Sequence, residues 1–372
     1  MAEISLSKTL AHWEKPRIVR ADRGFFKKLE LADNEKILIL SSPSHHNSGV
    51  IPQLLRELAP RITKAICNIS PNPTQTTISR VIAESQPEKW HTVIALGGGS
   101  VIDTAKIVSM FGSRFRTFEK LDLRHPDKHF EVNRTCRLIA VPTTAGTGSE
   151  VTQFATVWDE KLGEKYSVFS PNLLPDQAIL DPCLLKFSPS RLALYACLDA
   201  TAHCMETLWN KNRTSESIYF AKNGLEIIEK NISAFHKNLW NVKIAGQLQH
   251  AAVCGGLAIS ISRTAISHSI SYPLTAHLGI PHGLAVGFTL VAIYESLDDD
   301  ELSYVESQFP MAQLISKLKT LNLRPEIESY TNRSKIFSLI EKMSSSDRAT
   351  NFIKPVSHNL IVSILERCLP SE

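Results

Sequence analysis

One carboxylate and several imidazoles in the second half of the chain have the types and spacing of a metal site. Asp199 and His203 stand four residues apart in LDATAHCMET, hence on one face of a predicted helix. The segment SHSISYPLTAHLGIPHG adds His268, His277 and His282. A lone acid–imidazole pair is often only a surface contact, but three histidines in a stretch poor in Lys and Glu are difficult to explain as solvated surface. One carboxylate with two or three imidazoles suits iron(II) or zinc, with a position open for substrate.

Two glycine-rich turns in the first half of the chain have the composition of a nucleotide site. The first, GGGS at residues 97–100, joins a predicted strand to a predicted helix, where bare amides attract an anion such as a pyrophosphate. The second, PTTAGTGSE at residues 142–150, follows the next strand with four hydroxyl side chains and two glycines. Either could be a plain solvent-exposed turn. Two of them at the carboxyl ends of strands in one sheet favour a nucleotide cofactor.

Alternating strands and helices position these turns. Short apolar runs predict strands at residues 36–40, 64–69, 91–96 and 137–142. Helical patterns between them cover residues 49–58, 76–85 and 101–111. This alternation predicts a parallel sheet with helices on both faces and right-handed crossovers. Beyond residue 184 the pattern is helical throughout, so we expect an α/β domain over residues 1–184 and an all-helical domain over residues 185–372.

Composition excludes several other classes of protein. The 372 residues include 41 Lys and Arg against 37 Asp and Glu, a net charge of only +4, which disfavours a nucleic-acid or membrane-surface role. The seven cysteines form no C-x-x-C pair, which indicates a reducing compartment and no disulfide framework. Charges at the N-terminus do not fit a signal peptide, and no apolar run has the length of a membrane span. We therefore expect a soluble, cytoplasmic protein.

Taken together, the motifs resemble those of the iron-containing alcohol dehydrogenase family. They follow the family's order over roughly residues 35–290: GGGSVIDTAK, PTTAGTGSEVT, LPDQAILDP, DATAHCMET, and two histidines separated by thirteen residues that end in PHG. The resemblance implies a dehydroquinate-synthase-like fold, with NADH or NADPH on the α/β domain and a divalent metal, Fe²⁺ or Zn²⁺, on the helical domain. It also implies a homodimer or larger homo-oligomer.

The resemblance assigns a role to individual residues. The implied metal ligands are Asp199, His203, His268 and His282. The implied cofactor contacts are Gly98, Gly99, Ser100, Thr143, Thr144, Thr147 and Lys165. Asp103 matches the family's acid beside the nicotinamide. His277 falls where the family has an aromatic or variable residue, so it is expected in the wall of the substrate pocket and not as a ligand.

The sequence departs from the family pattern at two places. Many members carry a further histidine four residues after the third ligand, and here that position is Tyr272. Its hydroxyl could relay a proton, although its ordinary pKa near 10 is high for that task, or the ring could simply pack. The first strand ends in Ser41 and Ser42 where members that prefer NAD carry an Asp. With no carboxylate to repel a 2′-phosphate, and with His45 or His46 able to approach it, NADPH should be used at least as well as NADH.

The expected activity is hydride transfer from NAD(P)H to a small aldehyde polarised by the metal. The segment SRTAISHSISYPLTAHLGIPHG resembles the subgroup that reduces phosphonoacetaldehyde to 2-hydroxyethylphosphonate. Arg263, five residues before His268, is the expected anchor for an anionic substrate, unless it serves a surface or interdomain salt bridge. Two other readings stay open: a dehydroquinate-synthase-like lyase with no net redox change, and a non-catalytic nucleotide-binding protein.

Overall fold

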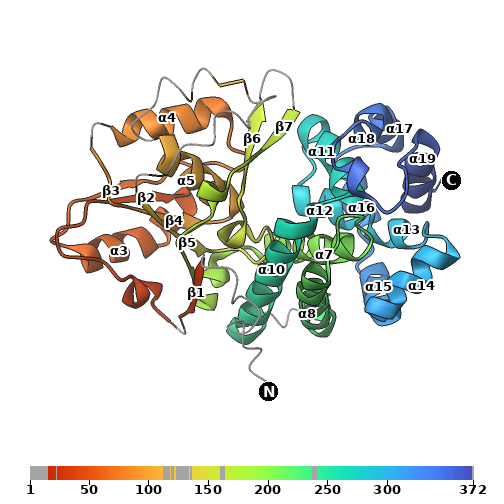
Figure 1. The fold of residues 1–372 in the computed structure, drawn as a ribbon, viewed down its shortest axis with the longest axis horizontal. Coiled ribbons are helices and arrows are strands. Elements are labelled where there is room, and N and C mark those ends of the chain that lie inside the picture. Colours follow the sequence, from red (N-terminus) through yellow and green to blue (C-terminus); the bar gives the residue numbers. More distant parts are fainter. Residues whose placement is uncertain are drawn as a thin grey trace. The chain divides into compact units, whose positions relative to one another are not determined.

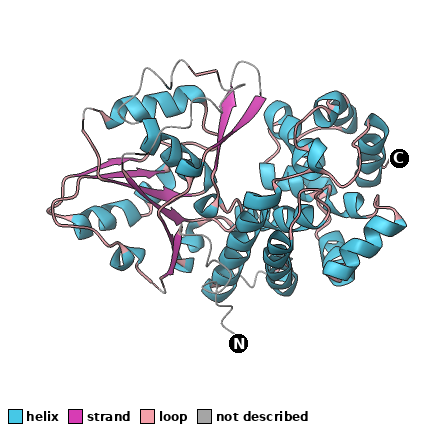
Figure 2. Ribbon diagram, viewed as in Figure 1, coloured by secondary structure: helices cyan, strands magenta, loops and turns pink. Residues whose placement is uncertain are grey.

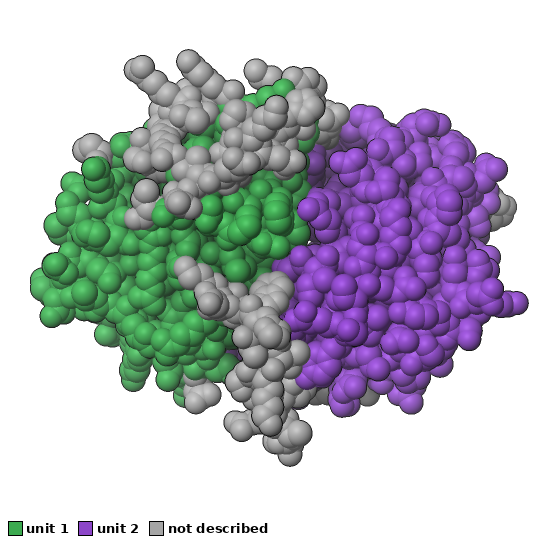
Figure 3. All heavy atoms as spheres, in the orientation of Figure 1, with its two compact units in different colours: residues 1–143, 149–157, 166–181 green, residues 144–148, 158–165, 182–372 purple. Residues whose placement is uncertain are grey.

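The computed structural model describes residues 16–21, 23–86, 88–111, 118, 121–122, 134, 136–159, 164–236 and 241–370. The chain divides into two compact units (Figure 3). Unit 1 comprises residues 1–143, 149–157 and 166–181. Unit 2 comprises residues 144–148, 158–165 and 182–372. The predicted combination of a parallel α/β part and an all-helical part is confirmed.

Unit 1 is built on a six-stranded sheet with the order β1-β8-β5-β4-β2-β3, in which every pair is parallel. The strands are β1 (Arg17–Arg20), β2 (Ile37–Ser41), β3 (Thr63–Ile66), β4 (Thr92–Gly97), β5 (Arg137–Pro142) and β8 (Gln177–Leu180). Four of them fall on the predicted apolar runs. The sequence analysis missed β1 and β8, which have four residues each and pair with one another.

Helices cover both faces of this sheet (Figure 1). They are α2 (Pro43–Asn47), α3 (Val50–Leu58), α4 (Gln75–Ser85) and α5 (Gly99–Phe111). Figure 1 shows α3 on one side of the sheet and α4 on the other. Every residue of β2 and β4 is buried, as expected for central strands of a parallel sheet. Leu38 and Leu40 of β2 join Ile78 and Ile82 of α4 in one apolar core.

A second, smaller sheet was not predicted. Strands β6 (Phe154–Asp159) and β7 (Glu164–Phe169) pair as a two-stranded sheet, visible in Figure 2 as a pair of magenta arrows. Short 3₁₀ segments complete the irregular parts of the chain: η1 (Phe25–Lys28), η3 (Ser149–Val151), η4 (Pro171–Leu173), η5 (Pro182–Phe187) and η6 (Ala349–Asn351).

Beyond residue 182 the described part of unit 2 is helical. Its longer helices are α7 (Ser190–Leu208), α8 (Ser215–Asn231), α10 (Val242–Ser262), α11 (Ile266–Leu278), α14 (Asp299–Gln308), α15 (Ala312–Thr320) and α19 (His358–Cys368). Its short helices are α9 (Ser233–His236), α12 (His282–Gly287), α13 (Leu290–Tyr294), α16 (Arg324–Glu328), α17 (Arg333–Phe337) and α18 (Ile340–Ser344). Among the described helices, α10 is the one with the length and apolar character of a membrane span, but 78% of its most apolar window is buried inside the protein, as in a core helix.

Candidate functional site

Helix α7 carries two carboxylates and an imidazole on one face. Asp199, His203 and Glu206 are spaced i, i+4 and i+7, which follows the helical repeat. All residues of α7 from Cys197 to Leu208 are buried. Burying charged side chains costs free energy unless a partner or an ion compensates them. The function of this face of α7 therefore depends on which side chains or ions compensate these three buried groups.

Helix α12 presents the next imidazole and is pressed closely onto α7. His282 opens α12, and a Cβ on the following Gly283 would lie 2.0 Å from the carbonyl oxygen of Tyr195. One turn later, a Cβ on Gly287 would lie 2.8 Å from the side chain of Leu198. No other residue type permits this approach of two helix backbones. The glycine after His282 thus holds this imidazole against α7.

Four side chains from α7, α11 and α12 converge on one point. The Nε2 atoms of His203 and His268 each lie 3.5 Å from Asp199 Oδ1, and His282 Nε2 lies 3.7 Å from the same oxygen. The rings of His203 and His268 stack with centroids 4.9 Å apart. The structure therefore gathers the other three predicted ligands around Asp199. The ligand atoms of Asp199, His268 and His282 all lie within 4.8 Å of one another, and His203 is close to Asp199 without joining that tighter group.

This donor set fits a divalent cation. Separations of 3.5 to 3.7 Å between nitrogen and oxygen are too long for good hydrogen bonds. The separations of the imidazole nitrogens from Asp199 Oδ1 are close to the separation of about 3.4 Å expected between two ligands placed tetrahedrally about 2.1 Å from an ion. Asp199 Oδ1 and His268 Nε2 are buried without a hydrogen-bond partner, a costly state that a shared ion would relieve. One carboxylate with three imidazoles is a set that Fe²⁺ and Zn²⁺ both accept.

Glu206 completes the site and was missed by the sequence analysis. Its carboxylate accepts a hydrogen bond from His268 Nδ1 at 2.6 Å and two more from the amides of Ala265 and His268, at 2.9 and 3.1 Å. It therefore fixes the ring of His268 with Nε2 toward Asp199, as carboxylates behind metal-binding histidines do. The available signal was its position three residues after His203 on the same helix.

Burial and neighbouring charges set the protonation of the four ligands. Burial would raise the pKa of Asp199, but the surrounding imidazoles hold it below its ordinary value. Burial lowers the pKa of His203 to about 4 and holds that of His282 well below its ordinary value, so both are neutral, the form that binds a metal. Burial would also lower the pKa of His268, but the carboxylates of Glu206 and Asp199 raise it to about 10.

Tyr272 lies beside the ligands, and two cationic side chains, Lys165 and Arg348, act on it. Its ring centroid is 6.1 Å from that of His268 and 5.8 Å from that of His282. Lys165 Nζ lies 4.2 Å from the same centroid, on the ring face. Burial would raise the pKa of Tyr272, but the charges of Lys165 and Arg348, and a hydrogen bond with Arg348, lower it to about 7. The sequence analysis did not single out Arg348.

The two glycine-rich turns start side by side in unit 1. The amide of Thr143 donates to the carbonyl of Gly97 at 3.0 Å, next to the pairing of Gly97 with Pro142. A Cβ on Gly97 would lie 2.6 Å from Val101, so this glycine lets the strand turn into α5. The predicted phosphate contacts Gly98, Gly99 and Ser100 follow at this turn; their role stays a prediction.

The glycines of the second turn have a packing role within unit 2. A Cβ on Gly146 would lie 2.8 Å from the Cα of Ala196 in α7, and one on Gly148 would lie 2.5 Å from the Cα of Gly256 in α10. Gly148 also has a positive φ of 61°. These glycines therefore serve close packing, which the sequence analysis did not anticipate. Thr144 and Thr147 flank them, and their assignment to the cofactor stays a prediction.

Asp103 is bonded through both carboxylate oxygens inside unit 1. It accepts hydrogen bonds from the Ser149 hydroxyl and, at 2.9 Å, from the amide of Thr156. Lys106 Nζ lies 3.7 Å away. Burial lowers the pKa of Lys106 to about 8 and raises that of Glu150 to about 7, although their charges attract. Asp103 thus ties the second turn to α5, and its predicted place beside a nicotinamide stays a prediction.

The carboxyl end of β2 presents hydroxyls and imidazoles. The Ser41 hydroxyl donates to the carbonyl of Leu96 at 2.6 Å, and the Ser42 hydroxyl lies 2.9 Å from His45 Nδ1. His45 is buried, which lowers its pKa, whereas His46 is exposed. Of the two histidines that could approach a 2′-phosphate, His46 is therefore the accessible one.

The two predicted substrate residues lie at helix ends. Arg263 is exposed at the C-terminal end of α10, with a φ of 64°. His277 is exposed near the end of α11, and its Nε2 lies 3.1 Å from Lys342 Nζ. Nine residues along an α-helix correspond to about 13 Å and about two and a half turns, so His277 lies on the opposite face of α11 from His268. The structure does not bring His277 to the four ligands.

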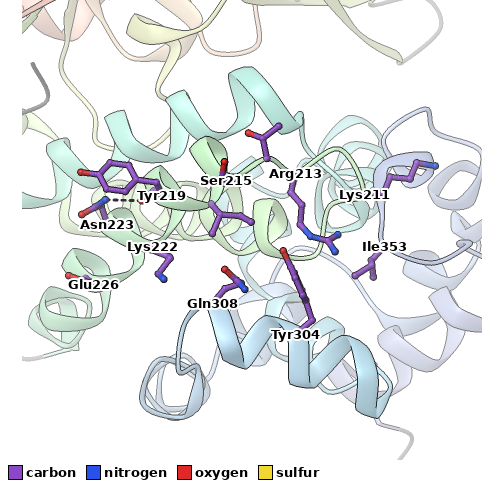
Figure 4. A pocket seen from close by; sticks show the side chains of 12 residues that line it. Lys211, Arg213, Ser215, Tyr219, Lys222, Asn223, Glu226, Tyr304, Gln308 and Ile353 are labelled. Carbon is purple, nitrogen blue, oxygen red and sulfur yellow. Dashed lines mark hydrogen bonds between the residues drawn. The ribbon is translucent and has the colours of Figure 1, made fainter. Parts of the chain in front are cut away.

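A separate cavity of about 880 Å³ lies in unit 2 (Figure 4). Its lining includes Lys211, Arg213 and Lys222, and the Arg213 guanidinium stacks 4.1 Å from the ring centroid of Tyr304. None of the twelve lining residues is one of the predicted site residues. This cavity is therefore distinct from the four-ligand cluster.

Comparison with known proteins gives matches along most of the chain. Residues 18–182 match the family model described as iron-containing alcohol dehydrogenase. Residues 193–351 match the model of the C-terminal part of the Fe-containing alcohol dehydrogenase family. The phosphonoacetaldehyde reductase of Streptomyces viridochromogenes is 32% identical over 63% of this chain and 62% of its own length. The bifunctional aldehyde-alcohol dehydrogenase of Escherichia coli is 30% identical over 75% of this chain and 33% of its own length.

Solved structures share the fold. The iron-containing alcohol dehydrogenase from Thermococcus thioreducens superposes with a TM-score of 0.83 at 23% identity, over 97% of this chain and 100% of that one. The sulfoacetaldehyde reductase from Bifidobacterium kashiwanohense, solved with NAD⁺, superposes with a TM-score of 0.82 at 21% identity, over 96% of this chain and 98% of that one.

Proposed function

Because the chain belongs to the iron-containing alcohol dehydrogenase family, we propose that it is a metal-dependent NAD(P)H aldehyde reductase. The resemblance inferred from the motifs is thereby confirmed. The observation that carries the proposal lies in unit 2, where the Nε2 atoms of three imidazoles lie 3.5 to 3.7 Å from one oxygen of the Asp199 carboxylate. The net reaction consumes an aldehyde, NAD(P)H and a proton and yields the primary alcohol and NAD(P)⁺.

Each residue of the cluster has a defined task in this reaction. Asp199, His203, His268 and His282 would hold Fe²⁺ or Zn²⁺, and Glu206 would keep His268 oriented. When bound, the metal supplies a Lewis acid for the carbonyl oxygen and the nicotinamide supplies the hydride.

We propose that Tyr272 donates the proton that the product oxygen receives. Its ring lies beside two ligand rings, with centroids 6.1 Å from that of His268 and 5.8 Å from that of His282, and against the effect of burial the charges of Lys165 and Arg348 lower its pKa.

Unit 1 would hold the dinucleotide at its two turns. The contacts we assign within unit 1 are Ser42, Gly98, Gly99, Ser100 and Thr143. The roles that the motif resemblance gives to Thr144, Thr147 and Lys165 stay predictions. Asp103 would stand beside the nicotinamide. Ser41, the last residue of β2, and the following Ser42 present no carboxylate to a 2′-phosphate, and His46 is exposed nearby. We therefore propose that NADPH is used at least as well as NADH.

The substrate we propose is phosphonoacetaldehyde, reduced to 2-hydroxyethylphosphonate. Its support is the motif resemblance around His268 and the name of the relative from Streptomyces viridochromogenes. All seven cysteines are free, in keeping with the proposed cytoplasmic location. We also propose a homodimer or larger homo-oligomer, on the family resemblance alone.

A screen of aldehydes tests the proposal. Protein reconstituted with Fe²⁺ or Zn²⁺ is given NADPH and a panel that includes phosphonoacetaldehyde and propanal, and NADPH oxidation is followed with alcohol formation. We expect one alcohol per NADPH oxidised. A reaction that turns over a sugar-like substrate without net NAD(P)H consumption would support the lyase alternative. Metal and nucleotide binding with no turnover of any aldehyde would support a non-catalytic binding protein.

A further inference from the structure

The turn between α10 and α11 (Figure 1) contains a residue in a backbone conformation that ordinarily belongs to glycine. Arg263 has φ 64° and ψ 173°, a combination that residues with a side chain rarely adopt. The other described non-glycine residues with positive φ are Asn72 and Asn322, and asparagine tolerates positive φ better than arginine does. A strained backbone persists only where the surrounding contacts enforce it. The contacts of residues 263–265, here called the elbow, should therefore show what enforces the strain.

Two buried asparagine side chains hold the elbow. Asn210 Nδ2 donates a hydrogen bond to the carbonyl oxygen of Arg263 at 3.0 Å, and Asn351 Nδ2 donates one to that of Thr264 at 2.8 Å. Asn210 follows the end of α7 and Asn351 ends η6, so they come from distant parts of the sequence. The amide of Lys211 donates to the Asn351 carbonyl at 2.9 Å, which joins these two parts to each other. Asn210 and Asn351 together are here called the clamp.

The elbow determines where α11 begins. Ala265 is the N-cap of α11 and has no side chain that could bond the free amides of the first turn. Glu206 of α7 bonds them instead, accepting from the amides of Ala265 at 2.9 Å and of His268 at 3.1 Å. Both bonds require the elbow to bring these amides to Glu206. In this arrangement His268 Nε2 lies 3.5 Å from Asp199 Oδ1, so the elbow affects the distance between two candidate ligands.

We propose that Asn210 and Asn351 are positioning residues of the metal site: they hold the elbow in its strained conformation and so place His268 beside Asp199. This inference rests on the metal site of the proposed function and on no particular substrate. The clamp acts on His268 through the main chain, whereas Glu206 also orients its ring. The inference concerns the backbone of Arg263, and an anchoring role for the side chain of Arg263 stays a prediction.

Removal of one clamp side chain tests the effect on metal binding. Asn351→Ala is compared with the control Asn231→Ala, which removes a similarly buried asparagine whose Nδ2 donates to the carbonyl of Ile227 at 2.7 Å. Zn²⁺ is titrated in competition with a chromophoric chelator. We expect Asn351→Ala to weaken Zn²⁺ binding about tenfold, as loss of a contact behind a metal ligand does, and Asn231→Ala to change it less than about twofold. Asn351→Asp keeps the acceptor for Asn212 Nδ2 and loses only the donor to Thr264, so it should show the same loss.

Substitutions of Arg263 test the strain. Arg263→Gly and Arg263→Ala both remove the side chain, but only glycine adopts a φ of 64° with this ψ at no steric cost. At one Zn²⁺ concentration, we expect the apparent melting temperature of Arg263→Gly to exceed that of Arg263→Ala by about 2 to 4 °C. In an Asn351→Ala background the elbow can relax, so this difference should fall by about half or more.

Three results would overturn the positioning role. An unchanged Zn²⁺ affinity in folded Asn351→Ala and Asn351→Asp proteins would show that the elbow does not place His268. An equal loss of affinity in Asn231→Ala would show that general destabilisation weakens binding. An Arg263→Ala protein as stable as Arg263→Gly would show that the elbow is not strained.

The same measurements separate this inference from the proposed function. Wild-type protein that binds Zn²⁺ but reduces no aldehyde would overturn the reductase function, and a weaker affinity in Asn351→Ala would then leave the positioning role standing. Wild-type protein that binds neither Zn²⁺ nor Fe²⁺ would overturn the metal site and the positioning role together. A wild-type reductase whose Zn²⁺ affinity Asn351→Ala does not change would overturn the positioning role alone.

Discussion

Replacing Glu206 by Gln should weaken metal binding while leaving all four ligands in place. The carboxylate of Glu206 accepts three hydrogen bonds, from His268 Nδ1 at 2.6 Å and from the amides of Ala265 and His268 at 2.9 and 3.1 Å. A Gln side chain offers one acceptor oxygen and one NH₂ group, so at least one of these donors would face another donor.

The loss of metal affinity and of folding stability in Glu206→Gln can be estimated from these contacts. Loss of the carboxylate behind a metal-binding imidazole typically reduces metal affinity about 10- to 100-fold, or about 1.4 to 2.7 kcal/mol. A buried donor left without an acceptor costs about 1 to 3 kcal/mol of folding stability as well. The apparent melting temperature of the metal-free variant should therefore also fall.

Chelator competition measures the affinity directly. Zn²⁺ is titrated into apoprotein in the presence of a chromophoric chelator, and the dissociation constants of wild type, Glu206→Gln and the control Glu226→Gln are compared. Glu226 is exposed on α8, so the control makes the same chemical change away from the cluster. An unchanged affinity in a folded Glu206→Gln protein would refute the orienting role of Glu206.

Three further predictions concern packing, pH and cofactor choice. Gly283→Ala should disrupt the contact of α12 with α7, because its Cβ would lie 2.0 Å from the Tyr195 carbonyl oxygen. The melting temperature and the number of metal ions bound per chain should both fall. A variant that is as stable as wild type and binds one ion per chain would contradict this. Burial raises the pKa of Glu150 to about 7 from an ordinary 4.5, so its contribution to stability is greatest below pH 4.5 and is lost as the pH rises to about 7. Glu150→Gln should thus gain up to about 3 kcal/mol over wild type in denaturant unfolding at pH 8 and almost nothing at pH 4.5; an equal difference at both pH values would contradict this burial effect. Ser42→Asp should lower kcat/KM for NADPH at least tenfold relative to that for NADH, since a carboxylate would repel a 2′-phosphate; an unchanged ratio would show that the end of β2 does not meet the 2′-position.

Four of the strands were predictable because their signals are local, and the four candidate ligands were named because they lie in compact motifs that resemble a known family. The apolar runs of β2 to β5 are short, continuous and bounded by turns, and the ligands lie in two short segments of α7 and α11–α12. Neighbours in sequence carry this information, so no long-range contact had to be known.

The remaining features depend on contacts between distant parts of the chain. β1 has four residues and becomes a strand by pairing with β8, whose residues follow about 160 positions later. Arg348, whose charge lowers the pKa of Tyr272, stands just before η6 with no motif to mark it. A glutamate three residues after a histidine is usually solvated on a helix surface, so only the burial of α7 identifies Glu206 as a partner of His268.

The most direct test of the central claim is X-ray absorption spectroscopy at the metal edge of protein loaded with one equivalent of Fe²⁺ or Zn²⁺. The account predicts three imidazole nitrogens and one carboxylate oxygen at about 2.0 to 2.2 Å, with the imidazole count falling by one in His203→Ala. A first coordination shell dominated by water or sulfur, or one that His203→Ala leaves unchanged, would contradict it.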